Sequence, residues 1–174
     1  MKKLASLILA LAMVLTAVCA FAEAEKPVAS PSVFGLTLIS IEGGEGEVLV
    51  PDEIAVNEIA RILNQVKEGT PISDLFGEEA AVALEGATDV LEAVWFQITK
   101  VDDGVDAVSV TLECATPFVA NVQALVGIPQ NDGSFRYLPL PTTVNGDGTV
   151  TFVLSGEALA SAMEGPVMAV FVQL

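Results

Sequence analysis

The spacing of apolar residues changes near position 52 and again near position 86. Residues 33–50 form two short apolar runs around a glycine-rich segment at 42–46, which predicts a hairpin. From about residue 52 apolar side chains recur at helical spacing as far as Val66, and either Asp52 or Asn57 can cap the start of this helix. A second helical stretch, broken near Gly77, is expected between residues 71 and 84. The N-terminal part is therefore predicted to be a hairpin followed by two short helices.

The same spacing predicts which faces of these helices are buried. The side chains expected to point inward from the second stretch are those of Leu75, Phe76, Val82 and Leu84. The acidic residues are expected on solvated faces, and they are Glu58, Glu68, Asp74, Glu78, Glu79 and Glu85. Such charge runs are typical of ordinary helix surfaces.

After Gly86 the pattern becomes that of β-strands. Strands are expected at 90–101 and 105–115, joined by a turn at 102–104, and then at 118–128, 149–154 and 167–174. The segment 118–128 is almost wholly apolar, which predicts a strand covered on both faces or an interface. Residues 134–144 contain two prolines and are expected to form an edge strand or an irregular crossing. A short helix is expected from Ser155 to Met163.

Together these elements predict an α+β fold. An N-terminal hairpin and two short helices lead into an antiparallel, Ig-like β-sandwich. Residues 33–174 are expected to form a single α+β unit, in which 33–86 is the hairpin plus helical segment and 87–174 the sandwich-like part.

The first 22 residues have the three parts of a secretory signal peptide. Lys2 and Lys3 provide a basic start, the apolar run 4–19 is 16 residues long, and Ala20 and Ala22 place small residues at the cleavage site. A membrane-spanning helix needs about 20 residues, so cleavage after Ala22 is favoured over a retained anchor. Lipidation of Cys19 is the alternative localisation. Residues 23–32 are expected to be a flexible leader.

Charge excludes some classes of partner. Beyond residue 22 the chain has five basic residues and 23 acidic ones, a net charge of −18. Nucleic acids and anionic membranes require clustered Lys and Arg, so neither is an expected partner. The predicted mature form contains no expected membrane span, and its acidity favours cationic or neutral partners.

The absence of histidine from the sequence removes several kinds of catalytic site. Ser-His-Asp triads, Cys-His pairs and the usual zinc sites all need an imidazole. Cys114 lies in a run that alternates apolar and polar residues, which predicts a small core residue rather than a nucleophile. A glycosidase needs only two carboxylates, so this class stays open. The sequence assigns no catalytic residue and implies no cofactor.

Calcium is the best small-ligand candidate, because it binds carboxylate oxygens in turns. The densest acidic turn contains Asp102, Asp103 and Asp106. No segment matches the 12-residue calcium loop, so we expect these residues to form a solvated turn rather than a metal site.

Several short segments resemble one group of bacterial proteins. They are the Thr70-Pro71 helix start with Ser73–Glu78, the motif Val126–Pro129, and Val144–Val150 followed by Leu154–Met163. This combination, spread over residues 52–174, is similar to uncharacterised small secreted proteins of Gram-positive bacteria. That group has no established activity, so the resemblance implies no functional residue.

Two functions follow as hypotheses. The first is an exported, non-catalytic acidic module that binds an extracellular protein or surface polymer, as small sandwiches commonly do. The alternative is an extracellular glycan hydrolase that uses a carboxylate pair. A cleft with two carboxylates about 5 to 10 Å apart beside an exposed aromatic residue would favour the hydrolase, whereas a flat or convex acidic surface without such a cleft would favour the module.

Overall fold

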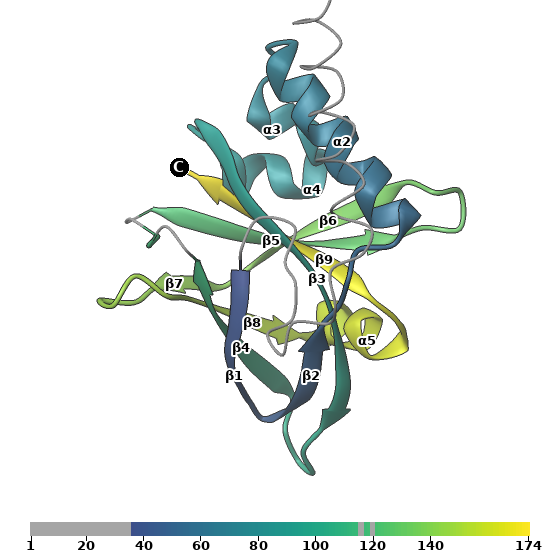
Figure 1. Cartoon of the computed structure of the whole chain (residues 1–174), viewed down its shortest axis with the longest axis vertical. Coiled ribbons are helices and arrows are strands. Elements are labelled where there is room, and N and C mark those ends of the chain that lie inside the picture. Colours follow the sequence, from purple (N-terminus) through teal and green to yellow (C-terminus); the bar gives the residue numbers. More distant parts are fainter. Residues whose placement is uncertain (1–35, 115–116, 119–120) are drawn as a thin grey trace, which may run out of the picture.

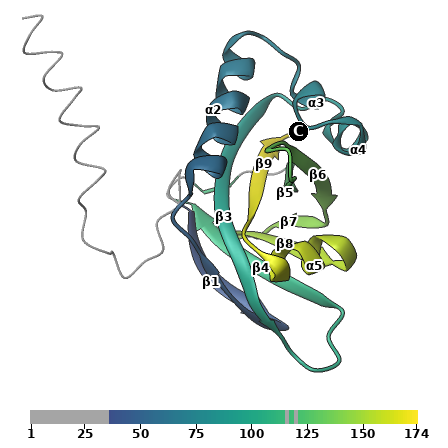
Figure 2. The same ribbon diagram turned by 90° about the vertical axis from the view of Figure 1, so that its right-hand side faces the viewer.

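The computed structural model describes residues 36–114, 117–118 and 121–174. These residues form two antiparallel sheets, with short helices against one of them (Figures 1 and 2). The α+β class and the sandwich-like pairing of sheets agree with the sequence pattern. The predicted signal peptide at 1–22, with Cys19, and the predicted leader at 23–32 lie outside the described residues.

The first two strands are joined at Gly43, inside the glycine-rich segment that predicted a hairpin. They are β1 (Leu36–Glu42) and β2 (Gly44–Val48), and each pairs with a different sheet. Gly43 has a φ of +87°, and a Cβ there would lie 3.0 Å from the Ala107 carbonyl oxygen. Glycine is needed for both reasons. The N-terminal hairpin is thus a strand–turn–strand unit that passes from one sheet to the other (Figure 1).

The remaining strands complete the two sheets. One sheet has the order β1-β4-β8-β7, and the other has the order β2-β3-β9-β5-β6. Every ladder is antiparallel. The strand bounds are β3 Asp89–Val101, β4 Ala107–Cys114, β5 Val122–Pro129, β6 Phe135–Leu140, β7 Thr142–Val144, β8 Val150–Ser155 and β9 Val167–Gln173.

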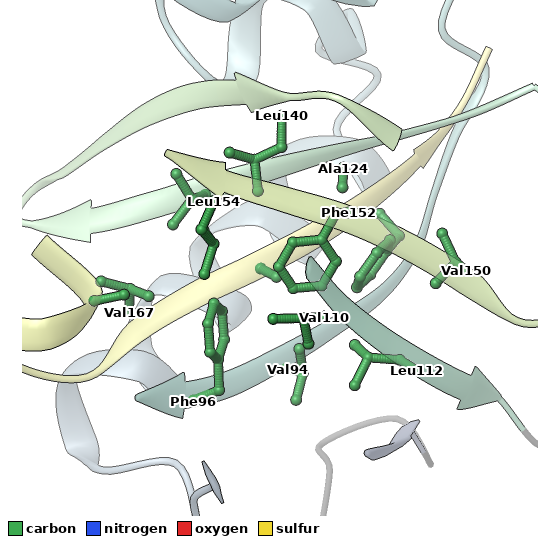
Figure 3. Packing of buried hydrophobic residues seen from close by; sticks show 14 of the residues in the cluster. Val94, Phe96, Val110, Leu112, Ala124, Leu140, Val150, Phe152, Leu154 and Val167 are labelled. Carbon is green, nitrogen blue, oxygen red and sulfur yellow. The ribbon is translucent and has the colours of Figure 1, made fainter. Parts of the chain in front are cut away.

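Apolar side chains from both sheets meet in the space between them. Figure 3 shows Val110 and Phe152 of the four-stranded sheet facing Val94 and Phe96 of the five-stranded sheet. The rings of Phe96 and Phe152 lie 5.7 Å apart at 63°, an edge-on contact that adds to the area they bury. Successive side chains along a strand point to opposite faces of a sheet, so residues two positions apart share a face. The apolar side chains at alternate positions therefore share the face that lies toward the other sheet.

The helical segment covers the outer face of the five-stranded sheet (Figure 2). It comprises α2 (Glu53–Lys67), α3 (Ile72–Leu75), α4 (Glu78–Ala81) and the 3₁₀ helix η1 (Val82–Leu84). The Asp52 side chain caps α2 by accepting from the Ala55 amide at 2.9 Å, so Asp52 and not Asn57 is the N-cap. This second apolar layer explains why β5 is buried on both faces, which confirms that prediction.

The two prolines of segment 134–144 lie at the sheet edges. Pro139 belongs to β6, the edge of the five-stranded sheet, and Pro141 stands between β6 and β7, the edge of the other sheet. The sequence predicted an edge strand or an irregular crossing, and the segment contains edge strands of both sheets with a crossing between them. Helix α5 (Gly156–Glu164) follows β8 and places Ala158, Leu159 and Ala162 in the core between the sheets.

One apolar position of the helical segment was predicted wrongly. Leu75, Phe76 and Leu84 are buried as expected, but Val82 is 84% exposed. Residues 82–84 form a 3₁₀ turn, in which three residues complete a turn instead of 3.6. Positions counted at α-helical spacing therefore rotate away from the sheet.

Cys114 and Glu92 form a polar contact at the margin of the core. Cys114 is buried, as the alternation predicts, and its Sγ donates to Glu92 Oε1 at 3.2 Å. The other oxygen of Glu92 is buried with no hydrogen-bond partner among the described residues. Burial raises the pKa of Glu92, and the thiol hydrogen bond opposes this only in part. Folding therefore makes the protonated form of this carboxyl group more favourable than it is in the unfolded chain.

Replacing Glu92 with Gln is expected to raise the free energy of unfolding at neutral pH. Folding raises the pKa of Glu92, so the protonated carboxyl group contributes to the free energy of unfolding. This contribution is complete at pH values below the pKa in the unfolded chain, and it is lost as the pH rises through the pKa in the folded protein. We expect a gain of about 1 kcal/mol or less, since a partly exposed group is screened by water. The gain should vanish near pH 4 in urea unfolding.

Glu113→Gln is the matched control, because Glu113 lies on the exposed face of β4. Its effect on the free energy of unfolding should be small at both pH values, because it is an exposed surface position. Equal behaviour of the two variants would contradict a special environment at Glu92.

Candidate functional site

A cleft of about 760 Å³ opens between the helical segment and the β5–β6 hairpin. Its walls come from α2, the turn between α3 and α4, and β6 with the turn before it. Helix α4 lies beside β6 at this end of the molecule (Figures 1 and 2). Its charged lining residues are Glu58, Arg61, Glu78, Glu79, Asp132 and Arg136. Its aromatic lining residues are Phe76, Phe135 and Tyr137.

Glu58 lies at the floor of the cleft, and only 7% of it is exposed. Arg61 donates to both of its oxygens, from Nε to Oε2 at 2.7 Å and from Nη2 to Oε1 at 2.5 Å. The hydroxyl of Tyr137 also donates to Oε1, at 2.8 Å. The expectation that Glu58 lies on a solvated helix face is wrong. Its charge is buried because a strand distant in sequence and a residue one helical turn away supply donors.

Arg61 connects this carboxylate to the next helix. Its Nη2 donates to the Leu75 carbonyl oxygen at 3.3 Å, at the end of α3, and its Nη1 donates to Gln65. The hydrogen bonds to Glu58 raise the pKa of Arg61. Burial, followed by the negative charge of Glu58, raises the pKa of Tyr137. Tyr137 therefore stays a neutral phenol that donates a hydrogen bond to the carboxylate.

The ring of Tyr137 rests on a glycine of the neighbouring strand. Gly127 is its cross-strand partner, and a Cβ on Gly127 would lie 2.6 Å from Tyr137 Cε1. Phe76 meets the same ring edge-on at 4.8 Å, and Phe135 stacks near it at 6.2 Å. The backbone of Gly127 and the two aromatic neighbours thus fix the position of the Tyr137 ring, and with it the position from which the hydroxyl donates to Glu58.

The rim of the cleft carries more exposed charges. Arg136 lies 3.7 Å from Glu79 and forms a closer ion pair with Glu157 of α5. Asp132 accepts hydrogen bonds from the Ser134 hydroxyl at 2.6 Å and the Ser134 amide at 3.0 Å, which lower the pKa of Asp132. Glu78 is exposed at the start of α4. The rim therefore combines a compensated guanidinium group with carboxylates that face water.

The calcium candidates Asp102, Asp103 and Asp106 lie in and beside the β3–β4 turn, at the opposite end of the molecule from the cleft (Figure 1). Within the ranges that the structure describes, no three His, Cys, Asp or Glu side chains are grouped to hold a metal ion. Asp102 Oδ1 lies 3.9 Å from the Lys100 ammonium, which pairs with Glu45 at 2.8 Å. A cation at Asp102 would have to compete with this lysine.

The sequence pattern pointed to none of the residues that build the cleft floor. The i, i+3 spacing of Glu58 and Arg61 is a signal for a helical ion pair, yet such pairs are usually exposed. Tyr137 is the only tyrosine of the chain, and nothing near it in sequence indicates that it faces α2. Trp95 of β3 is 4% exposed and is therefore a core residue.

Comparisons with protein-family models, with curated proteins and with solved structures found no match to this chain. The geometry of the described residues is therefore the basis for a functional proposal. In that part of the chain, no helix has the length and apolar character needed to cross a membrane.

Gly127→Ala is expected to destabilise the protein by about 1–3 kcal/mol, because the added methyl group collides with the Tyr137 ring and displaces its hydroxyl from Glu58. Thermal or urea unfolding measures the change. Gly146→Ala is the matched control, since a Cβ at Gly146 meets nothing within 4 Å. Wild-type stability of Gly127→Ala would show that Tyr137 is not held as described.

Proposed function

We propose that this chain is an exported, non-catalytic acidic module that binds an extracellular protein or a surface polymer. The observation that supports this best is the pairing at the floor of the cleft, where Glu58, Arg61 and Tyr137 satisfy one another. Both oxygens of Glu58 accept hydrogen bonds from Arg61, and one also accepts from Tyr137. Such a floor offers shape and charge to a ligand but no uncommitted acid or base.

Charge distribution limits the partners of this module. Of the four basic residues in the described ranges, Arg61, Lys100 and Arg136 each lie within 4.0 Å of a carboxylate. These positive charges are locally cancelled, so the described surface has no basic patch for nucleic acid or anionic lipid. The partner in this proposal is an extracellular polymer or protein that is neutral or cationic.

An Ig-like topology belongs to this proposal as well. Two antiparallel sheets of four and five strands that enclose one apolar core support it. The helical segment on the outer face of the five-stranded sheet would be an addition to that plan. In Ig-like sandwiches the loops at the ends of the sheets commonly carry binding sites, which agrees with a cleft beside the β5–β6 turn.

A glycan hydrolase is the second candidate. In its favour, one cleft brings together Glu58, Glu78, Glu79 and Asp132 with the partly exposed ring of Phe135. Against it, both oxygens of Glu58 already accept hydrogen bonds from Arg61 and Tyr137, so this carboxyl group is not free to transfer a proton to a substrate. The binding module is therefore the better-supported function.

Export is the part of the proposal carried by sequence. We propose that the signal peptide 1–22 is removed after Ala22, with a lipid anchor at Cys19 as the alternative. N-terminal sequencing of the protein from the culture medium of a bacterial host is expected to begin at Glu23. A protein that remains with the membrane and begins at a modified Cys19 would contradict free secretion.

Binding and hydrolysis can be separated in one assay. We expect the purified mature protein, immobilised and incubated with secreted proteins and cell-surface glycans, to retain a partner without releasing new sugar reducing ends. Release of reducing ends that disappears in Glu58→Gln or Asp132→Asn would establish the hydrolase instead. Unfolding curves of both variants must be recorded, because Glu58→Gln also alters the buried cluster.

A further inference from the structure

We infer that the cleft binds a lysine or arginine side chain of a polypeptide, between the rim carboxylates of Glu78 and Asp132 and the ring of Phe135. This inference rests on the proposed function and names its partner class, a cationic polypeptide. Three properties of the cleft support this inference: the negative charge that internal ion pairs do not neutralise, the aromatic wall and the volume.

The pairing pattern leaves the rim negative. Arg61 is neutralised by Glu58 inside the protein, and Arg136 is neutralised by Glu157 and Glu79. Glu78 and Asp132 have no ion pair with a basic residue in the described ranges, and both are exposed at the cleft. The hydrogen bonds from Ser134 keep Asp132 ionised. A cation from outside is the complement of this rim, and the acidic surface around it attracts such a cation.

The aromatic wall of the cleft, formed by Phe135, suits the apolar stem of a lysine or arginine side chain. Phe135 is only half-buried, with its ring near those of Tyr137 and Trp95 and its remaining surface in the cleft. Lysine and arginine place their apolar stems on such rings while the charged end reaches polar groups. A cation within about 6 Å of an aromatic face is also attracted to it. Neutral sugars would use the ring but would leave the rim carboxylates without a counter-charge.

The size favours a polypeptide over a free amine. A volume of about 760 Å³ lies within the range of roughly 300 to 1,000 Å³ that is typical of small-ligand sites, well above the space that one side chain needs. Residues on either side of the basic one can therefore enter too. Gln130, Gly133 and Ser134 of the β5–β6 turn also line the cleft.

The test is an NMR titration of the mature protein, labelled with ¹⁵N, with a blocked peptide of alternating alanine and lysine. We expect saturable shifts of the Gly77, Gly133 and Ser134 amides, which weaken as sodium chloride is raised. The same peptide with norleucine or glutamate in place of lysine should not bind there. Phe135→Leu should weaken binding several-fold while the salt dependence stays, since it removes the ring and no charge.

Two double variants with equal changes in charge test the location. Glu78→Gln with Asp132→Asn should weaken peptide binding roughly tenfold. Asp103→Asn with Asp106→Asn removes two charges at the opposite end of the molecule and should leave the affinity almost unchanged. Equal losses in both variants, or shifts spread over the whole surface, would overturn the inference and leave only general attraction to an acidic protein. If the immobilised protein retains a neutral glycan while the peptide leaves the cleft unperturbed, the module stands and this partner class is refuted.

Discussion

The five-stranded sheet has no face that can be left in water, and the other layers are arranged around this requirement. Six consecutive residues of β9, Val167 to Val172, are each at most 1% exposed, although their side chains alternate between the two faces. One face therefore needs a partner sheet and the other needs the helical segment (Figure 2). Burial of apolar area on both sides is the main favourable contribution to folding here.

Covering the outer face with helices creates a boundary at the β6 edge, where polar groups become buried. The Glu58 carboxylate would be strongly unfavourable there without partners. Arg61 and Tyr137 provide them, and Tyr137 can do so because Gly127 leaves room beneath its ring. This cluster links α2 to the sheet edge and to the end of α3. The cleft is lined by this cluster together with residues of the α3–α4 turn, α4 and the β5–β6 turn.

The arrangement bears directly on function. The most buried ionisable groups of the cleft are paired within the protein, which is typical of groups that support the fold. The exposed rim has carboxylates without an ion pair in the described part of the chain and the half-buried side chain of Phe135. A rigid floor with an open charged rim suits recognition, because a ligand finds the binding groups already positioned. The acidic β3–β4 turn is at the far end of the molecule, so its charge adds to the general field rather than to this cleft.

Much of the local structure was determined by the sequence alone. The Asp52 cap with helical spacing predicts α2, unbroken apolar runs predict strands covered on both faces, and prolines predict the edge strands, because these features depend on neighbouring residues. Tertiary structure decided which sheet receives each strand at the Gly43 turn, and it decided the burial of Glu58. Glu58 and Tyr137 are 79 residues apart. Periodicity reports which side of an element is apolar, but the residue that packs against it depends on contacts between distant segments.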